Sequence, residues 1–301
     1  MTAKVILNPY SGRWKALKRK AEAETALSMA GIQYEIVLTE RPDHGVQLAA
    51  DALRQGFSPI ISAGGDGSIS EVVNGMMQAC EGQPCQVPLG ILPLGSANDL
   101  VDNLSLPHDL QAAAGIIASG NSRRMDLCQV NGRYFDNNAA IGLEPFITLI
   151  QQRITRLHGD LRYLVATVRG VLANPQWTMS LEWEGGNYHG PITLVTVGNH
   201  PRTGGLFFVT PHANPFDGLL TFVYGFMPTR LQILRLLPKT MKPGVGSYVE
   251  HPSIHEINSP WLRVHAEQPT PMHADGEIQS TAIQDLEYRA LPGMLPVLVN
   301  E

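Results

Sequence analysis

The stretch Pro59-Ile60-Ile61-Ser62-Ala63-Gly64-Gly65-Asp66-Gly67-Ser68 decides how this chain is interpreted. It joins a short apolar run, typical of a strand, to a helix-like run at 71–77, and its three glycines leave backbone amides accessible at the start of the helix. Such a junction binds phosphate, or it is only a tight turn. Because Asp66 would repel a phosphate, phosphate binding here also predicts a divalent cation, Mg²⁺.

A second loop, Leu94-Gly95-Ser96-Ala97-Asn98-Asp99, occupies the same place in the pattern, after an apolar run at 89–92 and before a helix-like run. Taken singly, each loop has a structural alternative. Ser68 and Glu71 match a capping box, and Ser96 begins a similar helix-start signal. Two such loops at the carboxyl ends of neighbouring strands can face one crevice, and we therefore expect a nucleotide site.

The first part of the chain alternates strand-like and helix-like segments, a rhythm that predicts a parallel sheet covered by helices on both faces. We expect an N-terminal α/β domain at 1–125, and the segment 291–301 is a candidate to complete it. The expected strands are 5–8, 34–38, 60–63 and 89–92, and the expected helices are 14–30, 44–55, a helix from about Ser70, a helix from about Ala97, and 110–118.

From Met125 the pattern changes to short strands separated by Gly, Pro and Asn, which predicts an antiparallel β-sandwich at 126–290. Asn131-Gly132 is a hairpin signal. Two helical stretches interrupt the strands, 146–173 with a break near Gly159 and 231–241 with a kink or stop at Pro238. The other expected strands are 177–183, 192–198, 206–209, 219–224, 261–265 and 286–290.

Length and composition restrict the class of protein. The 301 residues suit two domains, and 44% hydrophobic with 16% charged residues is ordinary for a globular protein. No apolar run approaches the roughly 20 residues of a membrane span, and the N-terminus lacks a signal-peptide pattern, so we expect a cytoplasmic protein. The formal net charge of −5 argues against nucleic acid as a partner. Cys80, Cys85 and Cys128 have no metal spacing, and we expect unpaired thiols in a reducing compartment.

One segment is locally basic despite the negative net charge. It contains Arg13, Lys15, Lys18, Arg19 and Lys20. This segment is either a solvated helix face or a surface that attracts nucleotide phosphate or anionic lipid. In the second case the protein meets a membrane by transient, peripheral contact.

Five motifs in order along the chain resemble the diacylglycerol kinase catalytic domain family, which includes bacterial lipid kinases and is related to sphingosine and ceramide kinases. The resemblance covers nearly the whole chain. It implies an ATP site between an N-terminal α/β domain and a C-terminal β-sandwich, and transfer of the γ-phosphoryl group to a lipid hydroxyl. The motifs are Asn8-Pro9-Tyr10-Ser11-Gly12, Gly64-Gly65-Asp66-Gly67-Ser68, Glu71-Val72-Val73-Asn74-Gly75, Pro93-Leu94-Gly95-Ser96-Ala97-Asn98-Asp99 and Asp275-Gly276-Glu277.

Carried over position by position, the resemblance implies a set of nucleotide contacts. Two departures are visible: serine stands where the family commonly has threonine at 68 and 96, and Gly142-Leu143-Glu144-Pro145 replaces the usual Gly-Phe-Asp-Ala. Serine keeps the hydroxyl, so nucleotide binding should survive. The second departure leaves undefined which residues form the pocket wall at 142–145. The implied contacts are Asn8, Pro9, Tyr10, Ser11, Gly12, Thr39, Gly64, Gly65, Asp66, Gly67, Ser68, Ile69, Ser70, Glu71, Ser96, Asn98 and Asp99.

The resemblance also implies a Mg²⁺ site and a general base. The metal ligands would be Asp217 with oxygens of Asn214 and Leu219, and Asp126 would connect the metal region to the active site. From the residues alone, Asp217-Gly218 is a turn and Asp126 caps the start of a strand.

A lipid hydroxyl is a weak nucleophile and needs a positioned carboxylate to accept its proton. Glu277 and Asp275 are the favoured candidates and Asp66 is a third, although Asp275-Gly276 alone predicts only a hairpin turn. The histidines show no metal spacing and receive no role.

We therefore expect an ATP- and Mg²⁺-dependent lipid kinase whose acceptor is of the diacylglycerol, phosphatidylglycerol or sphingoid type. One rival is a kinase of NAD or of a sugar phosphate, against which the second loop argues. Another is a nucleotide-regulated lipid-binding protein without turnover, against which the four carboxylates Asp66, Asp217, Asp275 and Glu277 argue. The sequence does not locate the acyl-chain pocket, and it leaves open whether the protein forms a homodimer.

Overall fold

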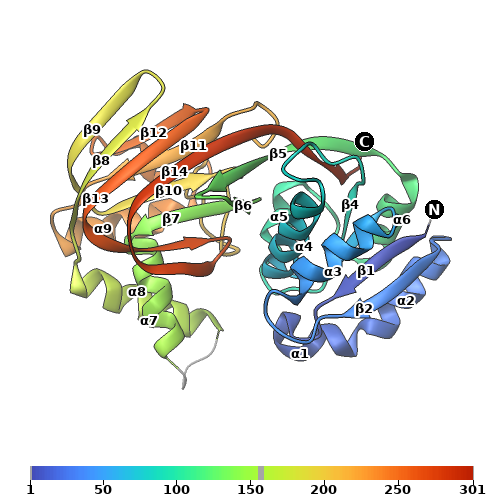
Figure 1. Ribbon diagram of the computed structural model, residues 1–301. Helices are drawn as coiled ribbons and strands as arrows, with labels where there is room; N and C mark the ends of the chain where they lie inside the picture. The colour runs from blue at the N-terminus through green and yellow to red at the C-terminus, as the bar shows by residue number, and fades with distance from the viewer. Residues whose placement is uncertain (1, 155–158, 301) are drawn as a thin grey trace. The chain divides into compact units, whose positions relative to one another are not determined.

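A computed structural model describes residues 2–154 and 159–300 of the chain (Figure 1). The chain divides into two compact units, each described here by itself. Unit 1 comprises Met1–Leu127, Arg133–Asp136 and Leu291–Glu301, and unit 2 comprises Cys128–Gly132 and Asn137–Ala290. Within the described ranges, no helix combines the length and the apolar character that crossing a bilayer requires.

Unit 1 is built on a parallel sheet in the order β4-β3-β1-β2. Every residue of β3 and β4 is buried, as expected for strands covered on both faces. The end of the last strand, β14 (Glu277–Leu298), pairs in parallel with β4 through Val297 and Leu89. The strands are β1 (Ala3–Leu7), β2 (Tyr34–Leu38), β3 (Ile60–Gly64) and β4 (Leu89–Pro93).

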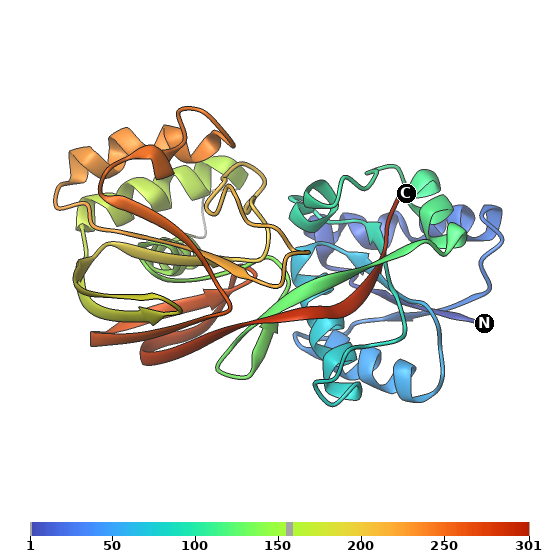
Figure 2. The same ribbon diagram turned by 90° about the horizontal axis from the view of Figure 1, so that it is seen from above.

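Helices cover both faces of this sheet (Figure 2). On one face α3 and α4 pack so closely that a Cβ added to Gly75 would lie 2.2 Å from the carbonyl oxygen of Val46. On the other face α2 and α6 bury small and aliphatic side chains against the sheet. The helices are α1 (Ser11–Lys18), α2 (Lys20–Met29), α3 (His44–Arg54), α4 (Asp66–Ala79), α5 (Asp99–Asn103) and α6 (Leu110–Ser119).

The starts of α4 and α5 differ from the expectation. Helix α4 begins at Asp66 instead of near Ser70, and α5 begins at Asp99 instead of near Ala97. The predicted serine caps are wrong, because the N-cap positions are occupied by Gly65 in α4 and by Asn98 in α5. Gly65 has no side chain, and the side chain of Asn98 does not cap α5. The hydroxyls of Ser68 and Ser96 are therefore not used to start the helices. The predicted helix 14–30 is also two helices, α1 and α2, which meet at Arg19.

Unit 2 is an antiparallel β-sandwich, as predicted. Its long strand β13 belongs to both layers. Leu262–Ala266 pairs with β8, and Met272–Ala274 pairs with β7. Between these two segments the register of β13 against β14 shifts, beginning after His265. One layer has the order β12-β11-β10-β7-β13, and the other has β9-β8-β13-β14. The strands of unit 2 are β7 (Asn138–Gly142), β8 (Trp177–Trp183), β9 (Gly186–Ile192), β10 (Leu194–Gly198), β11 (Leu220–Gly225), β12 (Ile254–Ser259), β13 (Trp261–Ala274) and most of β14. Most of β5 (Ser122–Val130) and all of β6 (Arg133–Phe135) belong to unit 1.

Three helices pack on unit 2 around one hydrophobic cluster that includes Ile147, Val171 and Ile233. They are α7 (Leu143–Arg153), α8 (Gly159–Ala173) and α9 (Arg230–Leu236), followed by 3₁₀ turns at Leu237–Met241 and Tyr248–Glu250. The stop at Pro238 is confirmed, because α9 gives way to a 3₁₀ turn there. The predicted break near Gly159 falls beside 155–158, which lie outside the described residues.

The strands of unit 2 were only partly predicted. The Asn131-Gly132 hairpin between β5 and β6 is confirmed. The strand expected at 206–209 is wrong, because this region forms only an isolated bridge between Thr203 and Phe207. Strands β7, β9 and β12 were not predicted, since their sequences, such as Gly-Asn-Tyr-His-Gly-Pro-Ile in β9, contain few β-branched residues.

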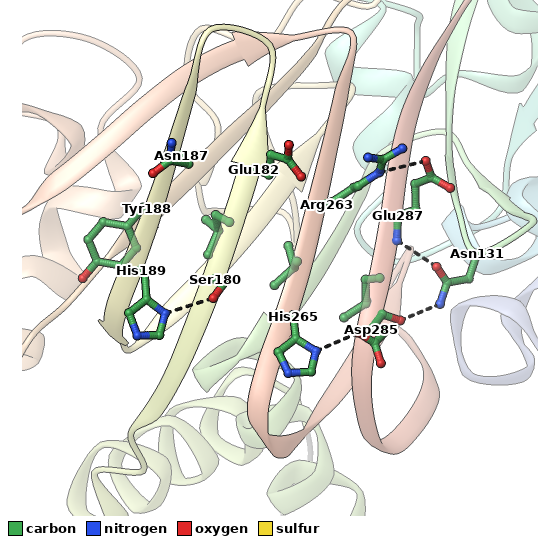
Figure 3. A pocket seen from close by; sticks show the side chains of 13 residues that line it. Asn131, Ser180, Glu182, Asn187, Tyr188, His189, Arg263, His265, Asp285 and Glu287 are labelled. Carbon is green, nitrogen blue, oxygen red and sulfur yellow. Dashed lines mark hydrogen bonds and ion pairs between the residues drawn. The ribbon is translucent and has the colours of Figure 1, made fainter.

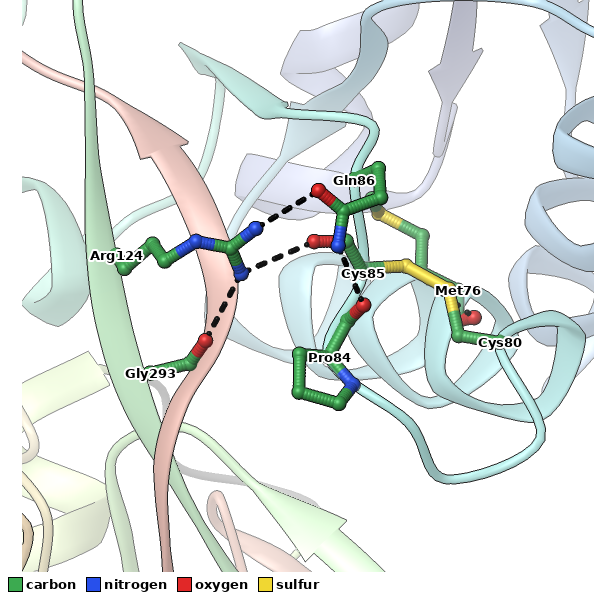
Figure 4. Close-up of a disulfide and its surroundings, with 7 residues drawn as sticks. All are labelled: Met76, Cys80, Pro84, Cys85, Gln86, Arg124 and Gly293. Atoms are coloured by element: carbon green, nitrogen blue, oxygen red, sulfur yellow. Dashed lines mark hydrogen bonds between the residues drawn. A yellow bond between two sulfur atoms is a disulfide. The ribbon is translucent and has the colours of Figure 1, made fainter.

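The cysteines also differ from the expectation of three free thiols. Cys80 and Cys85 form a disulfide across the turn that follows α4 (Figure 4), whereas the buried Cys128 keeps its thiol. The guanidinium of Arg124 on β5 donates to the carbonyl oxygens of Cys85 at 3.2 Å and Gly293 at 3.0 Å. The disulfide-closed turn is thus anchored to the segments of β5 and β14 that belong to unit 1.

Candidate active site

Three loops of unit 1 pack together beyond the carboxyl ends of β1, β3 and β4. A Cβ added to Gly95 would lie 2.4 Å from the Cα atom of Gly65, and one added to Gly65 would lie 2.9 Å from Cα of Gly95. Gly12 has a φ of +59°, and its added Cβ would lie 2.9 Å from the carbonyl oxygen of Leu94. These contacts leave no room for side chains, so glycine is required for the loops to meet. The three strands are neighbours in the sheet, with β3 paired in parallel to both β1 and β4.

The Ser68 hydroxyl is the centre of a polar cluster in the first glycine loop. It accepts a hydrogen bond from Nδ2 of Asn8 at 3.0 Å and contacts the Ser11 hydroxyl at 3.1 Å. The Gly65 amide donates to Oγ of Ser11 at 3.3 Å. The structure therefore brings Asn8, Ser11, Gly65 and Ser68 together, and the serine at 68 uses the hydroxyl that it shares with threonine.

Asp66 joins the two glycine loops. Its Oδ1 accepts the backbone amide of Leu100 at 3.2 Å, in the first turn of α5. Burial and the negative charge of the neighbouring Asp99 raise the pKa of Asp66 to about 6, against the opposing effect of backbone hydrogen bonds. A carboxyl with a pKa near neutrality can change its proton occupancy under ordinary conditions.

Asn98 and Ser96 complete the second loop in different ways. Oδ1 of Asn98 accepts the Gly95 amide at 3.1 Å, and Asn98 adopts a left-handed conformation with a φ of 53°. Its side chain is buried and fixes the backbone of the loop. Ser96 is exposed at the tip of the loop, beside the Gly65–Gly95 contact.

Glu71 and Asn74, both from the family-like motif on α4, support neighbouring backbone. Glu71 accepts the amides of Asp43 at 3.0 Å and Gly45 at 2.8 Å, so both of its carboxylate oxygens serve the start of α3. Asn74 exchanges two hydrogen bonds with the backbone of Tyr134 on β6. The nucleotide contact expected of Glu71 stays a prediction, and the geometry gives this side chain a supporting role.

The other expected nucleotide contacts are distributed around these loops. Thr39 follows β2, is buried, and donates its amide to the carbonyl oxygen of Leu7 at 2.9 Å. Tyr10 is half exposed, and its ring packs against Trp14 with 4.4 Å between centroids. Ile69 and Ser70 are buried inside α4. Gly64 ends β3, Gly67 is the second residue of α4, and Pro9 lies in the loop after β1.

In unit 2, Asp275 and Glu277 differ in their surroundings although they share one turn. Asp275 and Gly276 both have positive φ, 46° and 78°, and form the predicted hairpin between β13 and β14. Oδ1 of Asp275 accepts the amides of Asn137 at 3.0 Å and Asn138 at 3.2 Å. Glu277 is exposed at the first position of β14. The carboxyl of Asp275 therefore holds the backbone of a neighbouring strand, while that of Glu277 is accessible.

Sequence reasoning missed a buried polar network next to this turn. Oε1 of Glu144 lies 3.1 Å from Nε2 of His273, and Oε2 accepts the hydroxyl of Thr196 at 2.9 Å. Asn138 donates to Glu144 at 3.2 Å, which connects the network to the strand held by Asp275. Burial alone would raise the pKa of Glu144, but His273 and these hydrogen bonds outweigh it and hold the pKa below its ordinary value. No local sequence pattern marks this network, because Glu144 on α7 and His273 on β13 are more than 100 residues apart in the chain.

The expected metal ligands do not form one cluster within a unit. Asn214, Asp217 and Leu219 lie in a loop of unit 2 before β11, where Oδ1 of Asp217 accepts the Leu219 amide at 3.0 Å. Asp126 lies in unit 1 inside β5, where it is buried and accepts the Gly293 amide at 2.7 Å. Its expected position at the start of a strand is therefore wrong. Among the described residues, no three His, Cys, Asp or Glu side chains are placed to hold a metal ion.

A groove of about 880 Å³ lies on the β9-β8-β13-β14 layer of unit 2 (Figure 3). Cross-strand pairs line it: Ser180 with His189 at 2.9 Å and His265 with Asp285 at 2.7 Å. The residues that line the groove do not include any of the predicted site residues. These pairs tie neighbouring strands together, a stabilising role that polar cross-strand contacts commonly have.

Comparison with known proteins identifies the family. Residues 2–130 match the family described as diacylglycerol kinase catalytic domain, and residues 137–299 match the YegS C-terminal NAD kinase beta sandwich-like domain. A probable lipid kinase YegS-like from Chromohalobacter salexigens is 31% identical, over 91% of this chain and 86% of that protein. The chain belongs to the diacylglycerol kinase family. A diacylglycerol kinase from Staphylococcus carnosus is 25% identical over 91% of this chain and 88% of its own length.

Solved structures confirm the fold of this diacylglycerol kinase family member. The crystal structure of a putative diacylglycerol kinase from Bacillus anthracis superimposes with a TM-score of 0.81 at 21% identity, covering 99% of this chain and 95% of that chain. Both the family and the fold expected from the sequence are thus confirmed. The chain is an ATP-dependent lipid kinase, a phosphotransferase with an alcohol group as acceptor.

Proposed function

We propose that this lipid kinase phosphorylates the free hydroxyl of diacylglycerol within a membrane surface, with Mg²⁺·ATP as the phosphoryl donor. The observation that carries the proposal is the contact of the two glycine loops at Gly65 and Gly95, with Asp66 bonded to Leu100 across them. The acceptor is inferred from the similar proteins, which include diacylglycerol kinases at 25% identity and a probable lipid kinase at 31%.

The phosphates of ATP would lie at the start of α4. The first turn of a helix presents amides that lack partners within the helix, and its dipole attracts anions. Gly65 and Gly67 contribute no side chains to this turn, and the exposed Ser96 hydroxyl adds a donor from the second loop. The polar cluster around Ser68 holds the loop in place before the nucleotide arrives. Preorganised donors of this kind stabilise the charge that develops during phosphoryl transfer.

The residues proposed to hold Mg²⁺ fit the ion chemically. Asp217 offers a carboxylate that is oriented by the Leu219 amide, and Asn214 and Leu219 add oxygen donors. Asp126, in unit 1, accepts the Gly293 amide, and its expected link to the metal region stays a prediction. When bound, Mg²⁺ supplies positive charge that offsets the phosphate oxygens.

Glu277 is proposed as the general base and Asp275 as its positioning residue. The Asp275 carboxyl is engaged by two backbone amides and so fixes the hairpin, whereas Glu277 projects from the next strand into solvent. A base must approach the acceptor hydroxyl within hydrogen-bond distance, which an accessible carboxylate permits. Asp66, with its raised pKa, is the alternative base.

Transfer of label from γ-³²P-ATP tests this assignment. Separate vesicle preparations would contain diacylglycerol, phosphatidylglycerol or sphingosine, with NAD as a water-soluble acceptor. We expect label in phosphatidic acid, dependent on Mg²⁺, and a loss of at least 100-fold for Glu277→Gln. Label in another lipid would show that this lipid, and not diacylglycerol, is the acceptor. Lipid binding without label in any acceptor would instead favour a nucleotide-regulated lipid-binding protein.

A further inference from the structure

Helix α8 carries an apolar stripe on the face that points away from the core of unit 2. Its inner face packs through Ala166 and Val171 into the hydrophobic cluster. Leu164, Val168 and Leu172 are nevertheless exposed, Leu164 and Leu172 at 54% and 53%. Their spacing of four residues puts all three on one side of the helix. A helix that is apolar on both sides requires a partner for its outer side.

Helix α9 and the turn after it show the same arrangement. Ile233 and Leu236 enter the cluster that α8 also enters, whereas Leu231 is 55% exposed and Leu234 is also exposed. The chain then exposes Met241, and Val245 is 97% exposed. Helices α8 and α9 contact one another and lie side by side over the sheet (Figure 2). Because both bury their inner sides in one cluster, their exposed apolar residues face the same side of unit 2.

Exposed cations surround these apolar side chains. They come from Arg169 on α8, Arg230 and Arg235 on α9, and Lys239 and Lys242 after it. Across 159–173 and 229–246 the sequence contains a single acidic residue, Asp160. The region is therefore strongly basic, although the formal net charge of the whole chain is −5. We call these exposed apolar and cationic residues of α8, α9 and 237–245 the α8–α9 face.

We propose that the α8–α9 face docks on an anionic membrane surface. A surface helix with leucines on one side and cations around them lies in the plane of a bilayer interface, with its apolar side in the headgroup region. Each Lys or Arg near an anionic leaflet adds attraction that weakens with salt. A second copy of the chain is a poorer occupant, because a two-fold contact through this face would bring the same cations against one another.

This inference rests on the proposed function, since it names the surface on which the lipid acceptor is met. It assigns membrane contact to α8 and α9 of unit 2, whereas the sequence pointed to the basic segment 13–20 of unit 1. In the structure two cations of that segment are paired, Arg19 with Glu22 at 2.8 Å and Lys20 with Glu24. These pairs reduce the positive charge that the segment can offer.

Vesicle co-sedimentation of the full chain tests the proposal. We expect the wild type to sediment with vesicles of equal parts phosphatidylglycerol and phosphatidylcholine, and to bind pure phosphatidylcholine at least tenfold more weakly. Leu164→Glu with Leu231→Glu, and Arg169→Glu with Arg235→Glu, should each reduce binding to the mixed vesicles at least tenfold. Met29→Glu, at an exposed methionine of α2, and Arg54→Glu, on α3, are the matched controls and should bind as the wild type does.

A second measurement separates docking from catalysis. With short-chain diacylglycerol dispersed in water, the α8–α9 variants should keep wild-type activity, and with diacylglycerol in anionic vesicles they should lose it. Binding of the wild type to vesicles without phosphorylation of any lipid would defeat the proposed function and leave the docking proposal supported.

Three results would overturn the docking proposal. The first is binding of the α8–α9 variants to vesicles at the wild-type level, and the second is a wild type that binds neither kind of vesicle. The third is a wild-type dimer in sedimentation velocity that the leucine variants dissociate with vesicle binding unchanged, which would assign the face to a second copy. Circular dichroism melts of each variant check that the unit is folded.

Discussion

The carboxylate of Asp66 accepts the backbone amide of Leu100 at 3.2 Å, and this single bond joins the start of α4 to the start of α5. The two helices begin in different glycine loops, which contact one another through Gly65 and Gly95. An acid at a helix start is stabilised by the helix dipole, whereas burial and Asp99 act against its ionisation. The site therefore holds an acid whose charge costs stability.

Replacing Asp66 with asparagine should stabilise the protein at alkaline pH. The folded-state pKa of about 6 lies above the ordinary 3.8, so the protonated form contributes stability that is complete below pH 3.8 and lost as the pH rises through 6. Asparagine keeps the acceptor for Leu100 without the charge. We expect Asp66→Asn to be more stable by about 1–2 kcal/mol at pH 8 and nearly equal to the wild type at pH 4. Urea unfolding at both pH values measures this, and an equal difference at both would contradict it.

Adding one methyl group at Gly95 should separate the two loops. The new Cβ would lie 2.4 Å from the Cα of Gly65 and from Oδ1 of Asn98, so the backbone must move. We expect Gly95→Ala to lose about 1–3 kcal/mol of stability and to bind ATP at least tenfold more weakly by calorimetry. Gly115→Ala on α6 is the control, because its Cβ meets nothing within 4 Å and should stabilise by about 0.5–1 kcal/mol. Unchanged ATP affinity in Gly95→Ala would show that the loop contact does not shape the nucleotide site.

Glu144 should contribute to stability at neutral pH and lose its contribution in acid. Its folded-state pKa is below the ordinary 4.5, so the ionised form contributes stability above that value, which is lost as the pH falls through the folded pKa. Glu144→Gln leaves His273 without its anionic partner and should cost about 1–3 kcal/mol at pH 7. The cost should shrink at pH 3 in denaturant titrations. Glu277→Gln, at an exposed position, should leave stability unchanged. A cost for Glu144→Gln that does not vary with pH would argue against the pairing.

The disulfide predicts a specific thiol count. Titration of unfolded, unreduced protein should find one thiol, from Cys128, and three after treatment with a dithiol reductant. Cys80→Ser with Cys85→Ser should lower stability by about 2 kcal/mol, the chain-entropy value for so short a loop. Three thiols before reduction would restore the expectation that all the cysteines are free.

Sequence patterns predicted the alternating half of the fold well, because buried parallel strands such as β3 are continuous apolar runs and glycines mark where they end. They failed where the pattern was weak, as in β9. They also failed where a side chain that matches a local motif bonds to a distant segment of the chain. Ser68 matches a capping box, yet its hydroxyl bonds to Asn8 and its expected partner Glu71 holds the start of α3. The pair of Glu144 and His273 comes from elements more than 100 residues apart, which no local pattern detects.

The most direct test is a crystal structure of the protein with Mg²⁺ and a non-hydrolysable ATP analogue. The account predicts the phosphates at the start of α4, against the Gly67 amide, with the Ser96 hydroxyl within hydrogen-bond distance. Phosphates bound elsewhere, with the Gly65–Gly95 loops empty, would contradict it.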